Sequence, residues 1–151
     1  MNLLKIFLIS MVPLIEQRGA IPVGILVYHI NPFLVFIVSL IGSFLPAPFI
    51  FLFFNRILAW MKTVRIFHKF TKFIDKKVQK GAKKIETTME IGLTLFVGIP
   101  LPTTGLWTGT AIAAFLGLDF KKSMICVFLG GILSAVIITV LSVVAPAILG
   151  R

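Results

Sequence analysis

The sequence predicts an all-α integral membrane protein arranged as an inverted repeat, in which each half holds a re-entrant helical hairpin followed by a transmembrane helix. Three observations predict this class. The chain of 151 residues is 58% hydrophobic and 13% charged, a composition typical of membrane proteins. Two uncharged segments, Phe33–Phe54 and Ser123–Leu149, have the length of a transmembrane helix. Two other apolar segments, Leu3–Ile30 and Ile91–Leu118, are interrupted by proline, glycine and polar residues, which favours hairpins.

The first interrupted segment carries a polar triplet, Glu16-Gln17-Arg18, between stretches without charge. An ionised group at bilayer depth is costly unless it is paired or faces water. We therefore predict a substrate or proton site here, with Glu16 and Arg18 as partners. A short polar loop at the membrane surface is the alternative. The helix is expected to break around the triplet, at Pro13, Gly19 and Pro22.

The second interrupted segment breaks at Pro100, Pro102 and Gly105. Thr103 or Thr104 is expected to cap the helix that begins near Leu106. The N–H groups at that helix start would suit an anionic headgroup, and Trp107 would either stack on a ligand or fill space. We expect the two breaks to meet near the bilayer midplane, with Glu16 and Arg18 facing Thr103, Thr104 and Trp107. Close helix packing is the favoured role of the glycines Gly105, Gly109, Gly130 and Gly131.

The charge distribution predicts the topology. Ten of the 15 Lys and Arg residues lie between Arg56 and Lys84, so this segment is predicted to be cytoplasmic. Both termini are then expected outside the cell membrane, and the two hairpins enter it from opposite sides. The single membrane domain would divide into a first repeat (1–54), a cytoplasmic amphipathic linker (55–88) and a second repeat (89–151). Two alignments weakly support the repeat: Asn31 falls on Asp119 and Gly42 on Gly130 at the same offset.

The linker is predicted to be a basic amphipathic helix that lies on the cytoplasmic leaflet. Basic residues recur every three or four positions on one helix face, and apolar residues gather on the opposite face. This pattern is typical of binding to anionic lipid headgroups, and it disfavours nucleic acid as the partner. The predicted lipid-surface residues are Lys62, Arg65, Lys69, Lys72 and Lys76.

The remaining reactive residues predict no cofactor and no metal site. Cys126 lies alone in an apolar stretch, and His29 and His68 are far apart in the chain. No nucleophile with a base is apparent, so an enzyme is not predicted. We expect a homodimer, because so small a bundle would hardly enclose a polar site alone.

Four motifs resemble the putative small multidrug export protein family over nearly the whole chain. They are Glu16-Gln-Arg-Gly-Ala-Ile-Pro-Val-Gly24, Gly42-Ser-Phe-Leu-Pro46, Pro100-Leu-Pro-Thr-Thr-Gly-Leu-Trp-Thr-Gly109 and Gly117-Leu-Asp-Phe-Lys121. The resemblance implies a distant relation to the DedA (VTT-domain) membrane proteins, with re-entrant hairpins and proton-linked movement of lipids. Glu16 and Pro100 would match a DedA acidic residue and proline, whereas Ile25 stands where a second glutamate is expected.

The predicted function is a DedA-like membrane transporter. It is expected to be proton-linked and to move a small amphipathic molecule or an anionic lipid carrier such as a polyprenyl phosphate. The alternatives are a membrane-shaping or scaffold protein, in which Glu16 can be changed freely, an exporter of small drugs, and, least favoured, a membrane enzyme.

Overall fold

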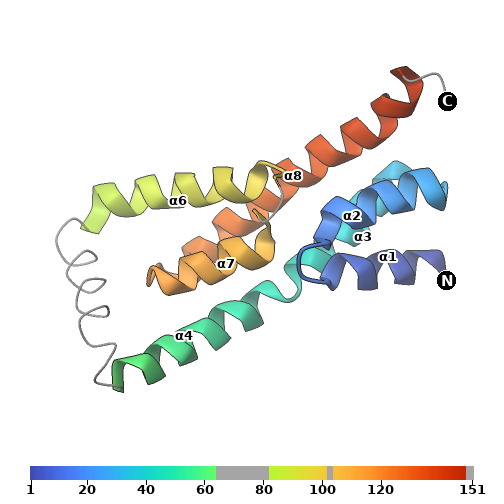
Figure 1. Ribbon diagram of the computed structural model, residues 1–151. Coiled ribbons are helices and arrows are strands. Elements are labelled where there is room, and N and C mark those ends of the chain that lie inside the picture. Colours follow the sequence, from blue (N-terminus) through green and yellow to red (C-terminus); the bar gives the residue numbers. More distant parts are fainter. Residues whose placement is uncertain (64–81, 102–103, 149–151) are drawn as a thin grey trace.

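The computed structural model describes residues 1–63, 82–101 and 104–148, and in these ranges it contains helices and no strand (Figure 1). The all-α prediction is confirmed. The elements are α1 (Asn2–Met11), α2 (Glu16–Pro22), the π-helix η1 (Val23–Val27), α3 (Pro32–Phe44), α4 (Ala47–Thr63), α6 (Ala82–Gly98), α7 (Leu106–Phe115) and α8 (Phe120–Ile148).

Two helical stretches, Pro32–Ile57 and Phe120–Pro146, are apolar and long enough to cross a membrane. The first contains the predicted span Phe33–Phe54, but it bends where α3 ends and α4 begins, at Leu45–Pro46. Proline lacks the backbone N–H that would continue the helical hydrogen bonding, which explains the bend. Of the predicted lipid-surface residues, Arg65, Lys69, Lys72 and Lys76 lie outside the described residues, as does the side chain of Lys62.

Each long helix packs first against the hairpin that precedes it and then against the other hairpin. In the first core, Ile6 of α1 and Ile21 of α2 meet Val35 of α3, together with Ile138 from the distal part of α8. The second core is formed by buried residues of α4, α6, α7 and the start of α8: Ala47, Phe51, Leu93, Val97, Leu106, Ala113, Ala114, Met124 and Val127. The two long stretches therefore run in opposite directions between the cores (Figure 1).

Asn31 and Asp119, which the repeat aligns, have the same role in the structure: each caps the N-terminus of a long helix. The Asn31 side chain accepts a hydrogen bond from the backbone N–H of Phe33 (2.9 Å) at the start of α3. The Asp119 carboxylate accepts one from the N–H of Lys122 (3.0 Å) at the start of α8. Both residues thus cap a long helix at its N-terminus. The inverted orientation of the halves in a bilayer stays a prediction.

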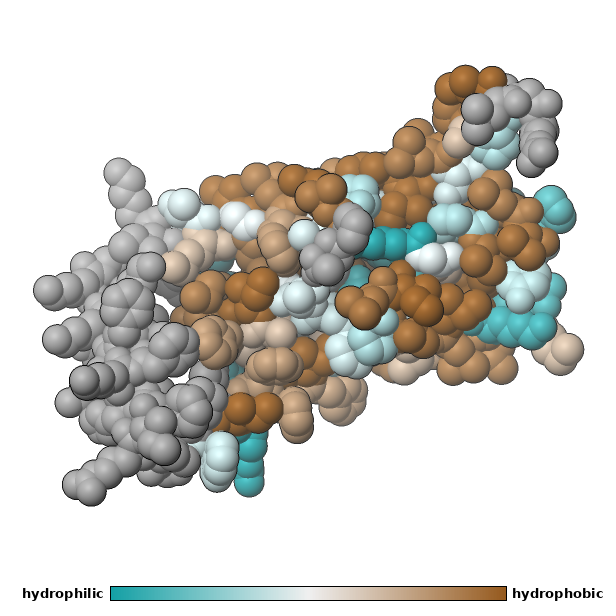
Figure 2. Space-filling view, viewed as in Figure 1, coloured by the Kyte–Doolittle hydropathy of each residue, from teal (hydrophilic) through white to brown (hydrophobic). Residues whose placement is uncertain are grey.

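The aligned glycines Gly42 and Gly130 are sites of close helix packing. A Cβ added at Gly42 would lie 2.8 Å from the carbonyl oxygen of Phe7 in α1, and one added at Gly130 would lie 2.6 Å from that of Thr94 in α6. Each long helix therefore approaches the first arm of its own hairpin at backbone distance, as predicted for Gly130. The face shown in Figure 2 is largely apolar, with a short hydrophilic band midway along the molecule.

Candidate functional site

The turn between α1 and α2 delivers Glu16 to the centre of the molecule. Helix α1 ends at Met11, and α2 begins at Glu16 itself. Two residues of this turn have positive φ angles, Leu14 (72°) and Glu16 (46°). Neither is glycine, so this left-handed backbone is strained by about 1–3 kcal/mol per residue and persists because the surroundings hold it. Such strain is often found where a side chain is positioned for function.

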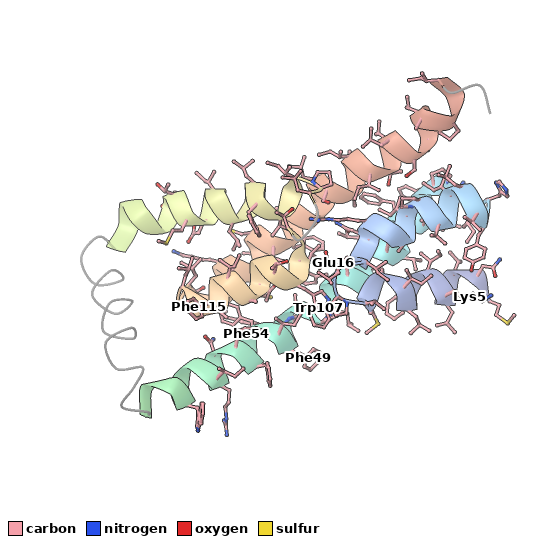
Figure 3. The ribbon with its side chains drawn as sticks, in the orientation of Figure 1. Lys5, Glu16, Phe49, Phe54, Trp107 and Phe115 are labelled. Atoms are coloured by element: carbon pink, nitrogen blue, oxygen red, sulfur yellow. The ribbon has the colours of Figure 1, made fainter. Side chains whose placement is uncertain are left out.

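The Glu16 carboxylate binds the N-terminus of α7. Its Oε2 accepts a hydrogen bond from the backbone N–H of Leu106 (3.0 Å), and its Oε1 accepts one from the N–H of Trp107 (2.9 Å). The carboxyl group is buried, with Glu16 only 2% exposed. A negative group at this position satisfies two orphan donors and is favoured by the helix dipole. Figure 3 shows Glu16 and Trp107 side by side where α2 meets α7.

Gly105 makes room for this carboxylate. It is the residue before α7 and has no side chain with which to cap the helix. A Cβ added there would lie 2.2 Å from Oε2 and 2.5 Å from Oε1 of Glu16. The prediction that Thr103 or Thr104 caps α7 is wrong for Thr104, because Glu16 performs that role. Thr103 lies outside the described residues, as does Pro102.

Arg18 holds the chain that leads into α7. Its Nη1 donates to the carbonyl oxygen of Leu101, and its Nη2 donates to Oγ1 of Thr104 at 3.1 Å. The Thr104 hydroxyl donates in turn to the carbonyl oxygen of Ile99 (2.8 Å). Arg18 thereby stabilises the second break, which follows α6 and includes Pro100. The Nε atom of Arg18 is buried and has no partner.

Gln17 connects the same triplet to α8. Its Nε2 donates to the carbonyl oxygen of Gly131 at 2.9 Å, and the residue is 1% exposed. Its Oε1 is buried without a partner. The three polar residues therefore reach three different places: α7, the 99–104 segment and α8. This explains how a charged triplet fits inside an apolar protein, since its polar atoms are largely satisfied by backbone groups.

The structure brings the two predicted breaks together, with Arg18 on Thr104 and Glu16 on the backbone of Trp107, as expected. One pairing differs from the expectation. We expected Glu16 to pair with Arg18. Instead, each binds the second break separately, and the N–H groups of Leu106 and Trp107 that we assigned to an anionic ligand are already taken by Glu16. The first break is also displaced. It is centred on Pro13 and Leu14, whereas Gly19 lies inside α2 and Pro22 ends it.

A cavity of about 210 Å³ opens beside this contact, and we call it the Glu16 cavity. Polar residues and apolar residues from α4, α7 and the α1–α2 turn share its walls. The lining residues are Pro13, Leu14, Glu16, Arg18, Ile50, Phe54, Gly105, Trp107, Thr108 and Ala111. Sequence reasoning missed five of them: Leu14, Ile50, Phe54, Thr108 and Ala111. Their only signal was helical spacing, because Ile50 and Phe54 are four positions apart in α4 and Thr108 and Ala111 are three apart in α7.

Within the described ranges, no group of three or more His, Cys, Asp or Glu side chains is placed to hold a metal ion. Cys126 is a half-buried free thiol.

Comparison with known families gives a match over most of the chain. A family model described as "Putative small multi-drug export protein" matches residues 16–137, which include α2, η1, α3, α4, α6, the second break, α7 and most of α8 but begin just after the first break. No curated protein and no solved structure matches the chain.

Proposed function

The chain belongs to the putative small multi-drug export protein family, and from this premise we propose that it is a proton-linked, DedA-like transporter. Its proposed cargo is a small amphipathic molecule or an anionic lipid carrier such as a polyprenyl phosphate. Family membership and the apolar helices indicate a membrane export protein rather than an enzyme. The proton link and the cargo are our proposal.

One observation carries the proposal: a buried carboxylate occupies the anion-binding end of α7 next to a cavity that Arg18 also lines. Helix N-termini bind phosphate and carboxylate groups through the same N–H donors. Glu16 is therefore an internal anion seated where the anionic group of a ligand would bind. A ligand and Glu16 compete for the two donors.

Protonation of Glu16 decides this competition. The ionised carboxylate accepts two charge-assisted hydrogen bonds, each contributing about 1.5–3 kcal/mol. A proton converts one of its oxygens to a hydroxyl and removes the negative charge. The hydrogen bonds from the N-terminus of α7 to Glu16 are therefore weakened. The N–H groups of Leu106 and Trp107 then become available to an anionic group, whose charge Arg18 also favours. Proton uptake thus promotes ligand binding, and proton release expels the ligand.

The test compares Glu16→Gln with Glu90→Gln in proteoliposomes loaded with a pH-sensitive dye. Farnesyl phosphate is added as the anionic probe and ethidium as the small-drug probe, and proton flux is recorded for each. Gln keeps the shape and one acceptor of Glu16 but cannot carry the proton. We expect substrate-dependent proton flux in the native chain and its loss in Glu16→Gln.

Glu90 provides the matched control. It is also a carboxylate on an apolar helix, but it pairs with Lys122 at 3.2 Å, away from the cavity lining. Flux should persist in Glu90→Gln. Proton flux in Glu16→Gln equal to that of the native chain would refute the proton role. Stable membrane insertion with no proton flux from the native chain or either variant would favour the membrane-shaping alternative. Flux with ethidium alone would identify an exporter of small drugs.

The proposal includes the membrane setting. The linker is cytoplasmic and binds anionic lipid through Lys62, Arg65, Lys69, Lys72 and Lys76, and the chain functions as a homodimer. Apparent mass in mild detergent tests the dimer. A monodisperse monomer that remains active after reconstitution would refute it.

A further inference from the structure

A second hollow adjoins the Glu16 cavity, and we call it the Phe49 groove. It has a volume of about 470 Å³ and is lined by apolar side chains: Met11, Leu45, Pro46, Phe49, Ile50, Phe53 and Trp107. Two of these residues, Ile50 and Trp107, also line the Glu16 cavity. The two hollows are therefore neighbours on either side of Trp107. Figure 3 shows Phe49 and Trp107 near each other, at the end of α4 that lies beside α7.

The α3–α4 bend forms the groove. Leu45 and Pro46 lie between the two helices, and Met11 ends α1 beside them. The groove opens on the outer surface, because Phe49 is 71% and Phe53 is 64% exposed. An apolar groove that opens sideways from an apolar helix faces hydrocarbon in a membrane protein.

Two residues that line the Glu16 cavity, Trp107 and Arg18, each hold a donor atom that makes no hydrogen bond. The indole Nε1 of Trp107 and the Nε of Arg18 are both buried without a partner, while both Glu16 oxygens already accept hydrogen bonds. A buried donor without a partner is costly, so a side-chain rotation that turns either donor toward the cavity is favoured when a ligand there supplies acceptors. Arg18 adds positive charge on the same wall. The complementary head is an anionic group rich in oxygen.

We propose that the Phe49 groove holds the hydrocarbon tail of a single amphipath whose anionic head lies in the Glu16 cavity against Trp107 and Arg18. The ligand then enters sideways from the bilayer, past Phe49 and Phe53, without its tail leaving an apolar medium. This inference rests on the proposed function, and it assigns that function's cargo a path and a tail site.

The experiment uses the full chain in phosphatidylcholine vesicles with dodecyl phosphate that carries a photoreactive diazirine near the tail end. Labelled residues are mapped by mass spectrometry after irradiation. Leu52 is the internal control, because it lies on the same helix, is 60% exposed and does not line the groove. We expect labelling at Phe49 and Phe53 to exceed that at Leu52 and to fall when unlabelled dodecyl phosphate is added.

Two further comparisons test the head. Dodecyl trimethylammonium with the same diazirine should label Phe49 no more than Leu52. Trp107→Phe keeps an aromatic ring but removes the N–H donor, and it should lower groove labelling by about tenfold, the equivalent of about 1.4 kcal/mol. Arg18→Gln should lower it at least as much, but Arg18 also holds the 99–104 segment, so Trp107→Phe is the decisive variant.

Equal labelling of Phe49, Phe53 and Leu52 that does not respond to competitor would overturn the proposal, because the groove would then be ordinary lipid-facing surface. Equal groove labelling by the phosphate and the ammonium would overturn the anionic head. The proposed function fails separately. Groove labelling without proton flux refutes the transport proposal alone, and proton flux without groove labelling refutes the tail site alone.

Discussion

The substitution Gly105→Ala tests the contact between the two halves most directly. The added methyl would lie 2.2 Å and 2.5 Å from the two Glu16 oxygens, so the carboxylate must leave the N-terminus of α7. The backbone is not the obstacle, because Gly105 has φ −123° and ψ −174°, an extended conformation open to alanine.

The cost follows from the hydrogen bonds that are lost. Two charge-assisted bonds at about 1.5–3 kcal/mol each give about 3–6 kcal/mol as an upper value, and partial hydration of the displaced groups reduces it. We expect Gly105→Ala to lower the free energy of unfolding by about 3 kcal/mol, a large effect for one methyl group.

A double-mutant cycle with Glu16→Ala isolates this contact. Without the Glu16 carboxylate the added methyl group has nothing to displace, so Gly105→Ala should then cost less than about 0.5 kcal/mol. Unfolding in detergent, monitored by circular dichroism, is measured for the native chain, the two single variants and the double variant. Gly92→Ala is the control, because an added Cβ meets nothing within 4 Å there, and alanine favours a helix by about 1 kcal/mol. Equal costs for Gly105→Ala with and without the Glu16 carboxylate would refute the reasoning.

Three other predictions concern helix packing, helix capping and topology. Gly130→Ala places a methyl 2.6 Å from the carbonyl oxygen of Thr94, so it should separate α6 from α8 and cost about 1–3 kcal/mol of unfolding free energy; an unchanged denaturation midpoint would contradict it. Asn31→Ala and Asp119→Ala each remove an N-cap and should each cost about 1 kcal/mol in the same assay, with additive effects because the caps belong to different helices. A cysteine introduced at Lys76 should be protected from an impermeant thiol reagent on intact cells, and free labelling there would contradict the predicted cytoplasmic linker.

The sequence predicted the helical class because length and hydropathy act locally. It predicted the meeting of the two breaks because segment length and the charge distribution indicate two hairpins that enter from opposite sides. It did not predict the partner of Glu16. We paired it with Arg18 because an ionised group at bilayer depth needs an opposite charge, yet residues two positions apart on a helix point in different directions. The actual partners, Leu106 and Trp107, contribute backbone N–H groups, which every residue except proline carries and which therefore leave no mark in the sequence.

The bend at Pro46 is a second feature that the sequence did not predict. A run of 22 uncharged residues, Phe33–Phe54, predicts a spanning helix by length alone. Whether a proline within such a run bends the helix depends on what packs beside it. In the structure α3 packs on the first hairpin and α4 on α7, so the two pieces serve different cores. The Phe49 groove exists because of that division, and neither its volume nor its neighbours could be read from the chain.

Each long helical stretch contributes residues to both cores, and this has a consequence for folding during synthesis on the ribosome. Ala135 and Ile138 of α8 form part of the first core. The side-chain amide of Gln17 donates to the carbonyl oxygen of Gly131, which is made 114 residues later in the chain. At 5–20 residues per second the ribosome needs about 6–23 s to make that interval. During this time the nascent first hairpin packs on α3, but the Gln17 amide and the core surface that α8 covers must be sheltered by the insertion machinery or by lipid. Truncation before α8 should therefore yield a chain that the cell's quality control removes, rather than half of a working protein.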